Sequence, residues 1–276
     1  MCDRGAARRD WSAALIVLGA VLPHPPVLLP EVGQGREHEA RATLDAYAIV
    51  ARRLCELDAR RLIMISTHGI VTLNRFHILA ESLSGNLSRF DSPGVTFGRD
   101  IDLDLTNAVV ACAADADVPL TVATQWEESD HSLGVPMRLL GDAVPEQSAV
   151  VSISFRPPEE HLRFGEAIGA ALARIKEPTA ILASGDAVHT LSDASAYGHH
   201  RRADEVQQQY ESALLAWEPP ALCAIDEHLR REVDESVISS TLILMGALRG
   251  IDVNPHILAS EHPWGVGYVT SLIEVS

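Results

Sequence analysis

Short apolar runs separated by a longer amphipathic stretch constrain the fold of this chain more than any other feature of its sequence. Residues 14–21 and residues 62–66 are apolar almost throughout, and a histidine follows each run closely. Runs of this length are typical of strands that are buried on both faces, as in a parallel sheet. A helix is expected from about residue 36, because apolar residues recur at three- and four-residue steps between residues 40 and 57. Strand, helix and strand in this order form a βαβ unit, whose crossover is almost always right-handed.

The same alternation continues to the end of the chain. We predict helices at residues 103–116, from residue 135, and at 159–176, 204–217, 221–233 and 237–248, with strands at 120–123, 149–155, 179–183 and 264–275. Residues 71–99 are mixed in character and are expected to contain an edge strand or a lid-like excursion. No internal repeat or low-complexity linker interrupts the pattern. The sequence therefore predicts one α/β domain over residues 1–276, with a mostly parallel central sheet, helices on both faces, and a flexible N-terminal extension at residues 1–12.

The charge balance excludes two classes of partner. The chain carries 22 Lys and Arg against 38 Asp and Glu, which gives a formal net charge of −16. A negative mean field repels phosphate backbones and anionic lipid headgroups. We therefore expect neither nucleic acid nor a membrane surface as a partner.

The N-terminus and the cysteines bear on the compartment. Basic residues ahead of the apolar stretch 13–22 resemble the start of a signal peptide, but no clean cleavage site follows, and the stretch is too short to cross a bilayer. We interpret it as the first strand. The cysteines are scattered without a C-x-x-C pair, and this spacing predicts free thiols. They are Cys2, Cys55, Cys112 and Cys223. Both observations favour the cytoplasm.

Histidines follow three of the predicted strands. His24 comes after the first strand, His68 after the second, and His189 after the strand that ends at residue 183. In open α/β sheets the loops beyond the carboxyl ends of the strands converge on one crevice, where ligands bind. Imidazole suits divalent iron, copper and zinc, and two histidines with one carboxylate leave coordination positions open for substrate and oxygen. For each histidine taken singly, a turn-capping role is the alternative.

Other common enzyme motifs are missing from the sequence. There is no G-x-x-x-x-G-K-[ST] and no G-x-G-x-x-G after a predicted strand, so nucleotide binding has no support. There is no G-x-S-x-G either, which argues against an α/β-hydrolase. The strand-end histidines remain the strongest indication of chemistry.

Five short motifs around these histidines carry a family resemblance. In chain order they are Pro23-His24-Pro25-Pro26, Ser66-Thr67-His68-Gly69, Asp130-His131 with Val135-Pro136, Ser184-Gly185-Asp186 with His189, and Gly265-Val266-Gly267-Tyr268. Together, from about residue 17 to the end, they resemble the class III extradiol ring-cleavage dioxygenase B-subunit superfamily. The chain looks most similar to the branch that includes the Memo proteins and their bacterial relatives.

The resemblance implies a role for individual residues. His24 and His68 match the two histidine ligands of the iron centre, and His189 matches the acid/base histidine beside it. His131 matches a pocket histidine that contacts substrate or oxygen. The third ligand implied is Glu235, which precedes a predicted helix ending in Gly-Ala-Leu. Relatives often have a cysteine next to this position, where the present chain has a serine, and the alternative for Glu235 is an acid in the first turn of a helix.

The implied activity is cleavage of a catechol-like or aminophenolic ring with O2 at an iron(II) centre, in a homo-oligomer. Zinc, copper and manganese are alternative metals, since imidazole ligands accept several divalent ions. Asp130 and Asp186 are candidates for orienting the histidine rings, with solvated or turn-capping roles as the alternative. The second hypothesis for the function is a Memo-like metal-binding or redox-linked protein without ring cleavage. A third is a partner-binding protein whose site has lost its activity.

Overall fold

The computed structural model of the protein describes residues 16–276. The flexible extension predicted for residues 1–12, the basic residues ahead of the first strand, and Cys2 lie outside the described residues.

An eight-stranded sheet forms the centre of the described chain, with the strand order β6-β3-β7-β2-β8-β1-β10-β9. The strands are β1 (Ile16–Leu22), β2 (Arg61–Ser66), β3 (Phe76–Leu79), β6 (Leu120–Ala123), β7 (Gln147–Ser152), β8 (Thr179–Ser184), β9 (Val253–Glu261) and β10 (Tyr268–Val275). Neighbouring strands from β7 through β2 and β8 to β1 are parallel, and β3 pairs with β6 in parallel. The β3–β7, β1–β10 and β10–β9 pairs are antiparallel. The prediction of one α/β domain with a mostly parallel sheet is confirmed.

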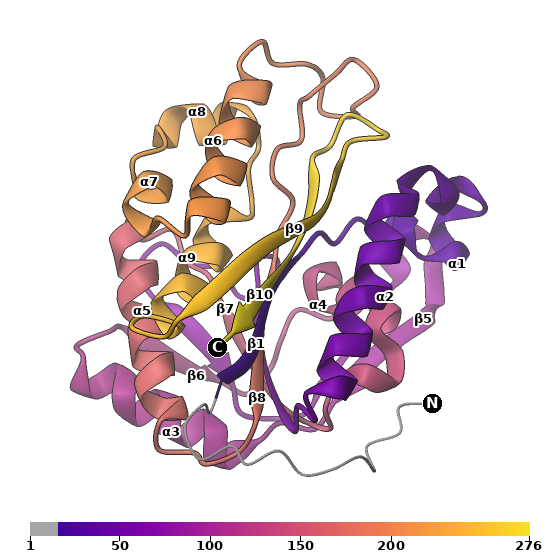
Figure 1. Ribbon diagram of the computed structural model, residues 1–276. Helices are drawn as coiled ribbons and strands as arrows, with labels where there is room; N and C mark the ends of the chain where they lie inside the picture. The colour runs from indigo at the N-terminus through magenta and orange to yellow at the C-terminus, as the bar shows by residue number, and fades with distance from the viewer. Residues whose placement is uncertain (1–15) are drawn as a thin grey trace.

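Helices cover both faces of this sheet (Figure 1). They are α1 (Pro30–Gly33), α2 (Arg41–Glu56), α3 (Leu103–Asp115), α4 (His131–Leu140), α5 (Pro158–Leu172), α6 (Ala203–Ala216), α7 (Pro219–Cys223), α8 (Glu227–Glu232) and α9 (Ile238–Ala247). Helices α3 and α5 to α9 contribute side chains to one hydrophobic cluster, while α2 and α4 contribute to a second cluster on the other face.

Strand β2 shows how the sequence produces the two clusters. Successive side chains of a strand point to opposite faces of the sheet. Ile63 and Ile65 accordingly lie in the first cluster, and Leu62 and Met64 lie in the second. All four side chains are buried, so the apolar run contributes to both cores, as expected for a parallel strand between two helical layers.

Residues 71–99 hold the excursion that the mixed sequence suggests, together with a strand of the main sheet. Strand β3 lies between β6 and β7, one position in from the edge. After it, β4 (Leu83–Leu87) and β5 (Ser92–Arg99) form a separate antiparallel pair, joined by the short 3₁₀ helix η3 (Ser88–Phe90). This β4–β5 hairpin packs on α4, because the Phe97 ring lies directly over Gly134 of that helix.

Three elements differ from the predictions. Strand β9 was not predicted, because Asn254, Pro255 and His256 are atypical of a strand; it lies at the edge of the sheet, where proline is tolerated. The helix predicted at residues 221–233 is divided into α7 and α8, since the Asp226 side chain accepts a hydrogen bond from Leu229 N and starts a new helix. Helix α4 begins at His131, four residues before the predicted start at residue 135.

The cysteines differ in state. Cys112 and Cys223 are free, as predicted. Cys55 is disulfide-bonded, which contradicts the prediction of a free thiol at this position. Spacing along the sequence does not report distance in the fold, and a disulfide depends on that distance. Among the described residues, no helix combines the length and apolar character needed to cross a membrane.

Candidate metal centre

Three histidines converge at the carboxyl edge of the central strands. Strands β1 and β2 flank β8 and run parallel to it, so the loops after them leave the same edge of the sheet, one strand apart. His24 follows β1, His68 follows β2, and His131 is the first residue of α4. One ligand nitrogen from each ring lies within 4.8 Å of the other two, and Nε2 of His24 is 3.0 Å from Nε2 of His68. We call these three residues the histidine cluster.

The rings of the histidine cluster differ in orientation and in access to solvent. The His68 and His131 rings are stacked, with centroids 4.2 Å apart and an interplanar angle of 20°. The His24 ring meets both of them edge-on, at 4.8 and 5.1 Å. His24 is buried, His131 is partly buried and His68 is exposed. The cluster is therefore open to solvent on the His68 side.

Neighbouring residues fix the His24 ring with one nitrogen facing the cluster. Its Nδ1 lies 2.8 Å from Ser184 Oγ at the end of β8, and its backbone N–H donates to Asp186 Oδ1 at 3.0 Å. The buried Tyr47 hydroxyl of α2 donates to the Pro23 carbonyl at 2.5 Å. A hydrogen bond at one ring nitrogen sets which nitrogen is left to act as a ligand. These contacts leave Nε2 of His24 to face His68.

The electrostatics of the cluster favour neutral rings. Burial lowers the pKa of His24 well below its usual value, and burial with the neighbouring His68 lowers the pKa of His131 to about 3. The pKa of His68 is also lowered, because its inner nitrogen is desolvated against His24 although the residue as a whole is exposed. Neutral imidazoles present lone pairs, the form that binds a metal ion. Two nitrogens each about 2.1 Å from one ion and at right angles to each other are about 3.0 Å apart, so the His24–His68 spacing fits a shared divalent cation.

His189 and Asp186 form a charged pair beside the cluster. Nδ1 of His189 donates to the backbone carbonyl of Asp234, and Nε2 lies 3.6 Å from Asp186 Oδ2. Burial opposes ionisation of Asp186, but the imidazoles of His24 and His189 hold its pKa at about 2. Burial likewise opposes a charge on His189, but the hydrogen bond and charge of Asp186 outweigh it and raise the pKa of His189. His189 therefore differs from the cluster in being suited to carry a proton.

Two aromatic rings stand against these histidines from different segments. The partly buried Phe90 of η3 meets the His131 ring at 4.9 Å, and Tyr197 meets the His189 ring at 4.9 Å. Tyr197 belongs to the loop that follows β8 and is 61% exposed. Aromatic rings next to a polar centre suit a flat aromatic ligand.

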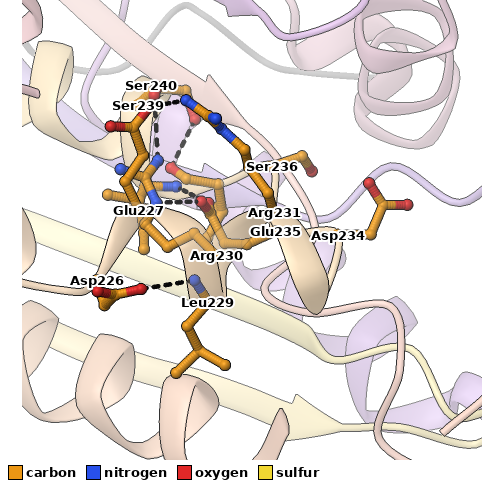
Figure 2. Close-up of polar contacts among 12 residues, drawn as sticks. Asp226, Glu227, Leu229, Arg230, Arg231, Asp234, Glu235, Ser236, Ser239 and Ser240 are labelled. Atoms are coloured by element: carbon orange, nitrogen blue, oxygen red, sulfur yellow. Dashed lines mark hydrogen bonds and ion pairs between the residues drawn. The ribbon is translucent and has the colours of Figure 1, made fainter. Parts of the chain in front are cut away.

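Glu235 makes its contacts outside the histidine cluster. Its Oε2 lies 2.8 Å from Arg230 Nε, and its Oε1 accepts a hydrogen bond from Ile238 N in the first turn of α9 (Figure 2). The side chain is 1% exposed. In this structure both carboxylate oxygens are therefore engaged by the arginine and the helix start.

Asp234, the preceding acid, behaves differently. Its backbone has a left-handed φ of 53°, and its side chain points away from the Arg230–Glu235 pair (Figure 2). Burial has the largest effect on the pKa values of His68 and His189 and lowers both. Asp186 raises the pKa of both, Asp130 raises that of His68, and the charge of Asp234 raises both by a smaller amount. Asp234 is thus the acid of this segment that acts on the site histidines.

Comparison with known proteins identifies the family. A family model described as the catalytic LigB subunit of aromatic ring-opening dioxygenase matches residues 18–271. This chain belongs to the LigB family.

Two relatives illustrate the range of the LigB likeness. Protein CA_C1420 of Clostridium acetobutylicum is 25% identical over 264 residues, covering 92% of this chain and 56% of that protein. The chain therefore spans about half the length of the curated relative that it matches. The crystal structure of uncharacterized protein JW3007 from Escherichia coli K12 matches with a TM-score of 0.62 at 17% identity, covering 94% of this chain and 99% of that one. The second match shows a shared fold.

The structure brings together three of the histidines that the sequence singled out. His24 and His68, predicted as ligands, lie with His131, which was predicted to contact substrate or oxygen. These roles stay predictions. His189 lies beside them, paired with Asp186. The sequence analysis assigned no site role to Ser184, although it lies in the Ser184-Gly185-Asp186 motif and contacts His24. Phe90, Tyr197 and Asp234 were not singled out, because they belong to none of the five motifs.

Proposed function

We propose that this LigB-family protein is a non-haem iron(II)-dependent extradiol-type dioxygenase that opens a catechol-like or aminophenolic ring with O2. The observation that carries the proposal is the convergence of three imidazole nitrogens, within 4.8 Å of one another, at the carboxyl edge of a LigB domain. An oxygen-dependent metal enzyme needs such donors together with free coordination positions, and an opening for substrate.

His24 and His68 are the proposed protein ligands of the metal. His131 offers a third nitrogen in the geometry described, and Glu235 is the oxygen ligand that the family resemblance implies. Glu235 would first have to leave Arg230 and the start of α9. When bound there, iron(II) would supply the chemistry that brings substrate and O2 together for ring opening.

His189 is the proposed acid/base. Its hydrogen bond to the Asp234 carbonyl fixes Nδ1 as a donor, so the nitrogen that would exchange protons is Nε2, which lies 3.6 Å from Asp186 Oδ2. Nε2 would take a proton from a phenolic hydroxyl and return it during ring opening, and a raised pKa makes it a stronger base. Asp186 holds the ring and stabilises its charged form.

Phe90 and Tyr197 support an aromatic substrate. Each ring already packs edge-on against a site histidine, and a planar substrate in contact with either ring would gain aromatic contacts worth about 0.5–1.5 kcal/mol beyond area burial. The net charge of −16 speaks against nucleic acid as an alternative partner. A homo-oligomer and a cytoplasmic location are parts of the same proposal; the location now rests on the interpretation of residues 13–22 as a strand, since Cys55 is not a free thiol.

Oxygen uptake tests the proposed activity. Anaerobically reconstituted iron(II) protein is mixed with a panel of catechols and aminophenols, and oxygen consumption is followed with an electrode. We expect uptake that requires iron(II), disappears in His24→Ala, and persists in His228→Ala, which removes an exposed histidine of α8. Stoichiometric metal binding without uptake on any substrate would favour the Memo-like alternative, and failure to bind any divalent metal would favour a decayed site.

A second experiment tests Glu235 as the third ligand. Glu235→Gln keeps the size of the side chain and removes its charge. If Glu235 binds the metal, its loss should weaken metal affinity more than the 10–100-fold typical of residues that only support a ligand. If its partners remain Arg230 and Ile238, the substitution should lower the melting temperature and leave metal affinity unchanged.

A further inference from the structure

Asp130 precedes α4 at the position where an aspartate normally caps a helix, but its side chain does not cap this one. An N-cap aspartate usually accepts a hydrogen bond from a backbone N–H of the first turn, which stabilises the helix by about 1 kcal/mol. Asp130 is fully buried at 0% exposure, and its carboxylate is directed elsewhere. A buried carboxylate that does not bond to the backbone N–H groups of its helix needs other hydrogen-bond donors.

Those partners connect Asp130 to the turn that carries His68. Oδ2 accepts a hydrogen bond from Ser66 Oγ at 2.6 Å, and Oδ1 accepts one from Ser132 Oγ at 2.6 Å. Ser66 Oγ in turn accepts the backbone N–H groups of His68 at 3.2 Å and of Gly69 at 2.8 Å. A hydroxyl has one donor and two acceptor sites, so Ser66 is saturated by these contacts.

Ser132 completes the same arrangement. Its Oγ accepts the backbone N–H of Thr67 at 3.2 Å while donating to Asp130. Three consecutive backbone N–H groups, those of residues 67 to 69, therefore end at one carboxylate through two hydroxyls. The orientation of the His68 turn depends on the position of Asp130.

Trp126 closes the network from the outer side. Its Nε1 donates to Asp130 Oδ2 at 2.8 Å, and a side-chain carbon added to Gly69 would lie 2.4 Å from the Trp126 ring. The indole thus covers the turn and holds the carboxylate at once. Because any side chain at residue 69 would strike this ring, the close approach requires glycine there.

The charge of Asp130 is the remaining feature to explain. No Lys, Arg or His of residues 16–276 forms an ion pair with it, and the three donors that reach the carboxylate are neutral. Burying an ionised carboxylate without a cation is costly. The carboxylate lies next to the histidine cluster, to which Ser66 links it through the His68 backbone N–H. A metal cation held by the cluster would compensate the charge of Asp130.

We propose that Asp130 is the positioning residue of the metal centre. It holds the His68 turn through Ser66 and Ser132, adjoins His131 in the chain, and supplies a buried negative charge that strengthens cation binding by the cluster. The inference rests on the metal site of the proposed function, but not on ring cleavage. Residues of this kind around metal ligands typically change affinity by about 10–100-fold.

The test is a titration with Co²⁺ alone, followed by visible absorption, on wild type and Asp130→Asn. The amide keeps the shape of the side chain but cannot accept from Ser66, Ser132 and Trp126 together. We expect affinity to fall by about 10–100-fold with a changed absorption spectrum, while far-ultraviolet circular dichroism is retained.

Asp102→Asn is the matched control. Asp102 is also a buried N-cap aspartate, but its side chain caps α3 through Leu105 N and pairs with Arg61 at the opposite edge of the sheet. This control should lose stability and keep the Co²⁺ affinity and spectrum of wild type. If Asp130→Asn does not fold, Ser66→Ala removes the link to His68 and Gly69 and should weaken Co²⁺ binding in the same direction.

Each outcome is decisive. The positioning role is overturned if Asp130→Asn, or Ser66→Ala where that variant replaces it, has the Co²⁺ affinity and spectrum of wild type. It is also overturned if Asp102→Asn loses as much Co²⁺ affinity as Asp130→Asn. Either result leaves the dioxygenase proposal intact. Weakened binding in Asp130→Asn in a protein that consumes no oxygen supports the positioning role and removes the dioxygenase. A wild-type chain that does not bind Co²⁺ overturns both.

Discussion

The two ends of strand β2 show how differently this sheet treats polar groups at its two edges. At the amino end, Arg61 contacts Asp102 at 2.6 Å and Glu177 at 3.1 Å, so its charge is matched by acids. Just past the carboxyl end, His68 faces His24 and His131 instead. The charges at the amino edge compensate one another, whereas the carboxyl edge gathers neutral nitrogen donors. This difference supports the proposal of a metal centre at the carboxyl edge.

The largest expected effect is on stability, at the amino edge. Arg61→Met leaves Asp102 buried at 9% exposure without its cation and should lower the free energy of unfolding by about 3–5 kcal/mol. Urea unfolding at pH 7 measures this change, and Co²⁺ affinity at low urea should equal that of wild type. A parallel loss of metal affinity would break the contrast between the edges.

At the carboxyl edge the expected effect is on binding. His68→Ala removes one of the proposed ligands and should weaken Co²⁺ binding by more than about 100-fold, the upper range for residues that only support a ligand. The exposed position of His68 predicts little change in urea unfolding of the metal-free protein. Retained stoichiometric binding in this variant would show that the cluster is not the metal site.

At the carboxyl edge, the free energy of unfolding should also depend on pH. The pKa of His131 is about 3 in the folded protein, mainly because of burial, against about 6.5 when unfolded. Between these values the unfolded chain binds more protons, so the contribution of His131 is complete above about pH 6.5 and is lost as pH falls. Each such histidine lowers stability by about 1.4 kcal/mol per pH unit within that window.

The measurement is the slope of unfolding free energy against pH for metal-free wild type and His131→Gln. The variant should have the shallower slope between pH 6.5 and 5. His161 lies outside the cluster and has a pKa of about 4 from burial, so part of the acid sensitivity should persist. Identical slopes would mean that His131 is not held neutral.

The smallest expected effect concerns Tyr197, one of the two aromatic rings that pack against the site histidines. Tyr197→Leu removes a ring packed on His189 and should raise KM for a catechol by about 2- to 10-fold with kcat unchanged, matching the 0.5–1.5 kcal/mol of an aromatic contact. Tyr197→Phe keeps the ring and should behave as wild type. A fall in kcat instead would assign the hydroxyl a part in the chemistry.

The sequence was sufficient for the elements that depend on local pattern. The apolar runs of β1, β2 and β8 were found because burial on both faces requires apolar residues throughout. The strand-end positions of His24 and His68 followed from parallel topology. Strand β9 was not predicted, because an edge strand can contain a proline such as Pro255 and need not be apolar throughout.

The finer features of the site depend on tertiary structure. His131 was expected in a polar loop, since its role as the first residue of α4 carries no periodic signal. The orientations of Asp234 and Glu235 follow from the left-handed backbone at Asp234, and no residue pattern there announces such a turn. Although Asp234 and Glu235 are adjacent in the chain, Glu235 pairs with Arg230 and Asp234 acts on the histidines.

The β4–β5 hairpin has a consequence for changing substrate range. Phe97 of this hairpin packs on Gly134 of α4, and Asn86 N donates to the Glu128 carbonyl at 2.8 Å, just ahead of His131. Phe90, which packs against His131, and His131 itself thus belong to one packed unit. Exchanging the hairpin alone for that of a relative would disturb the helix start that carries His131. A graft intended to alter specificity should transfer residues 83–99 and 126–140 as one cassette.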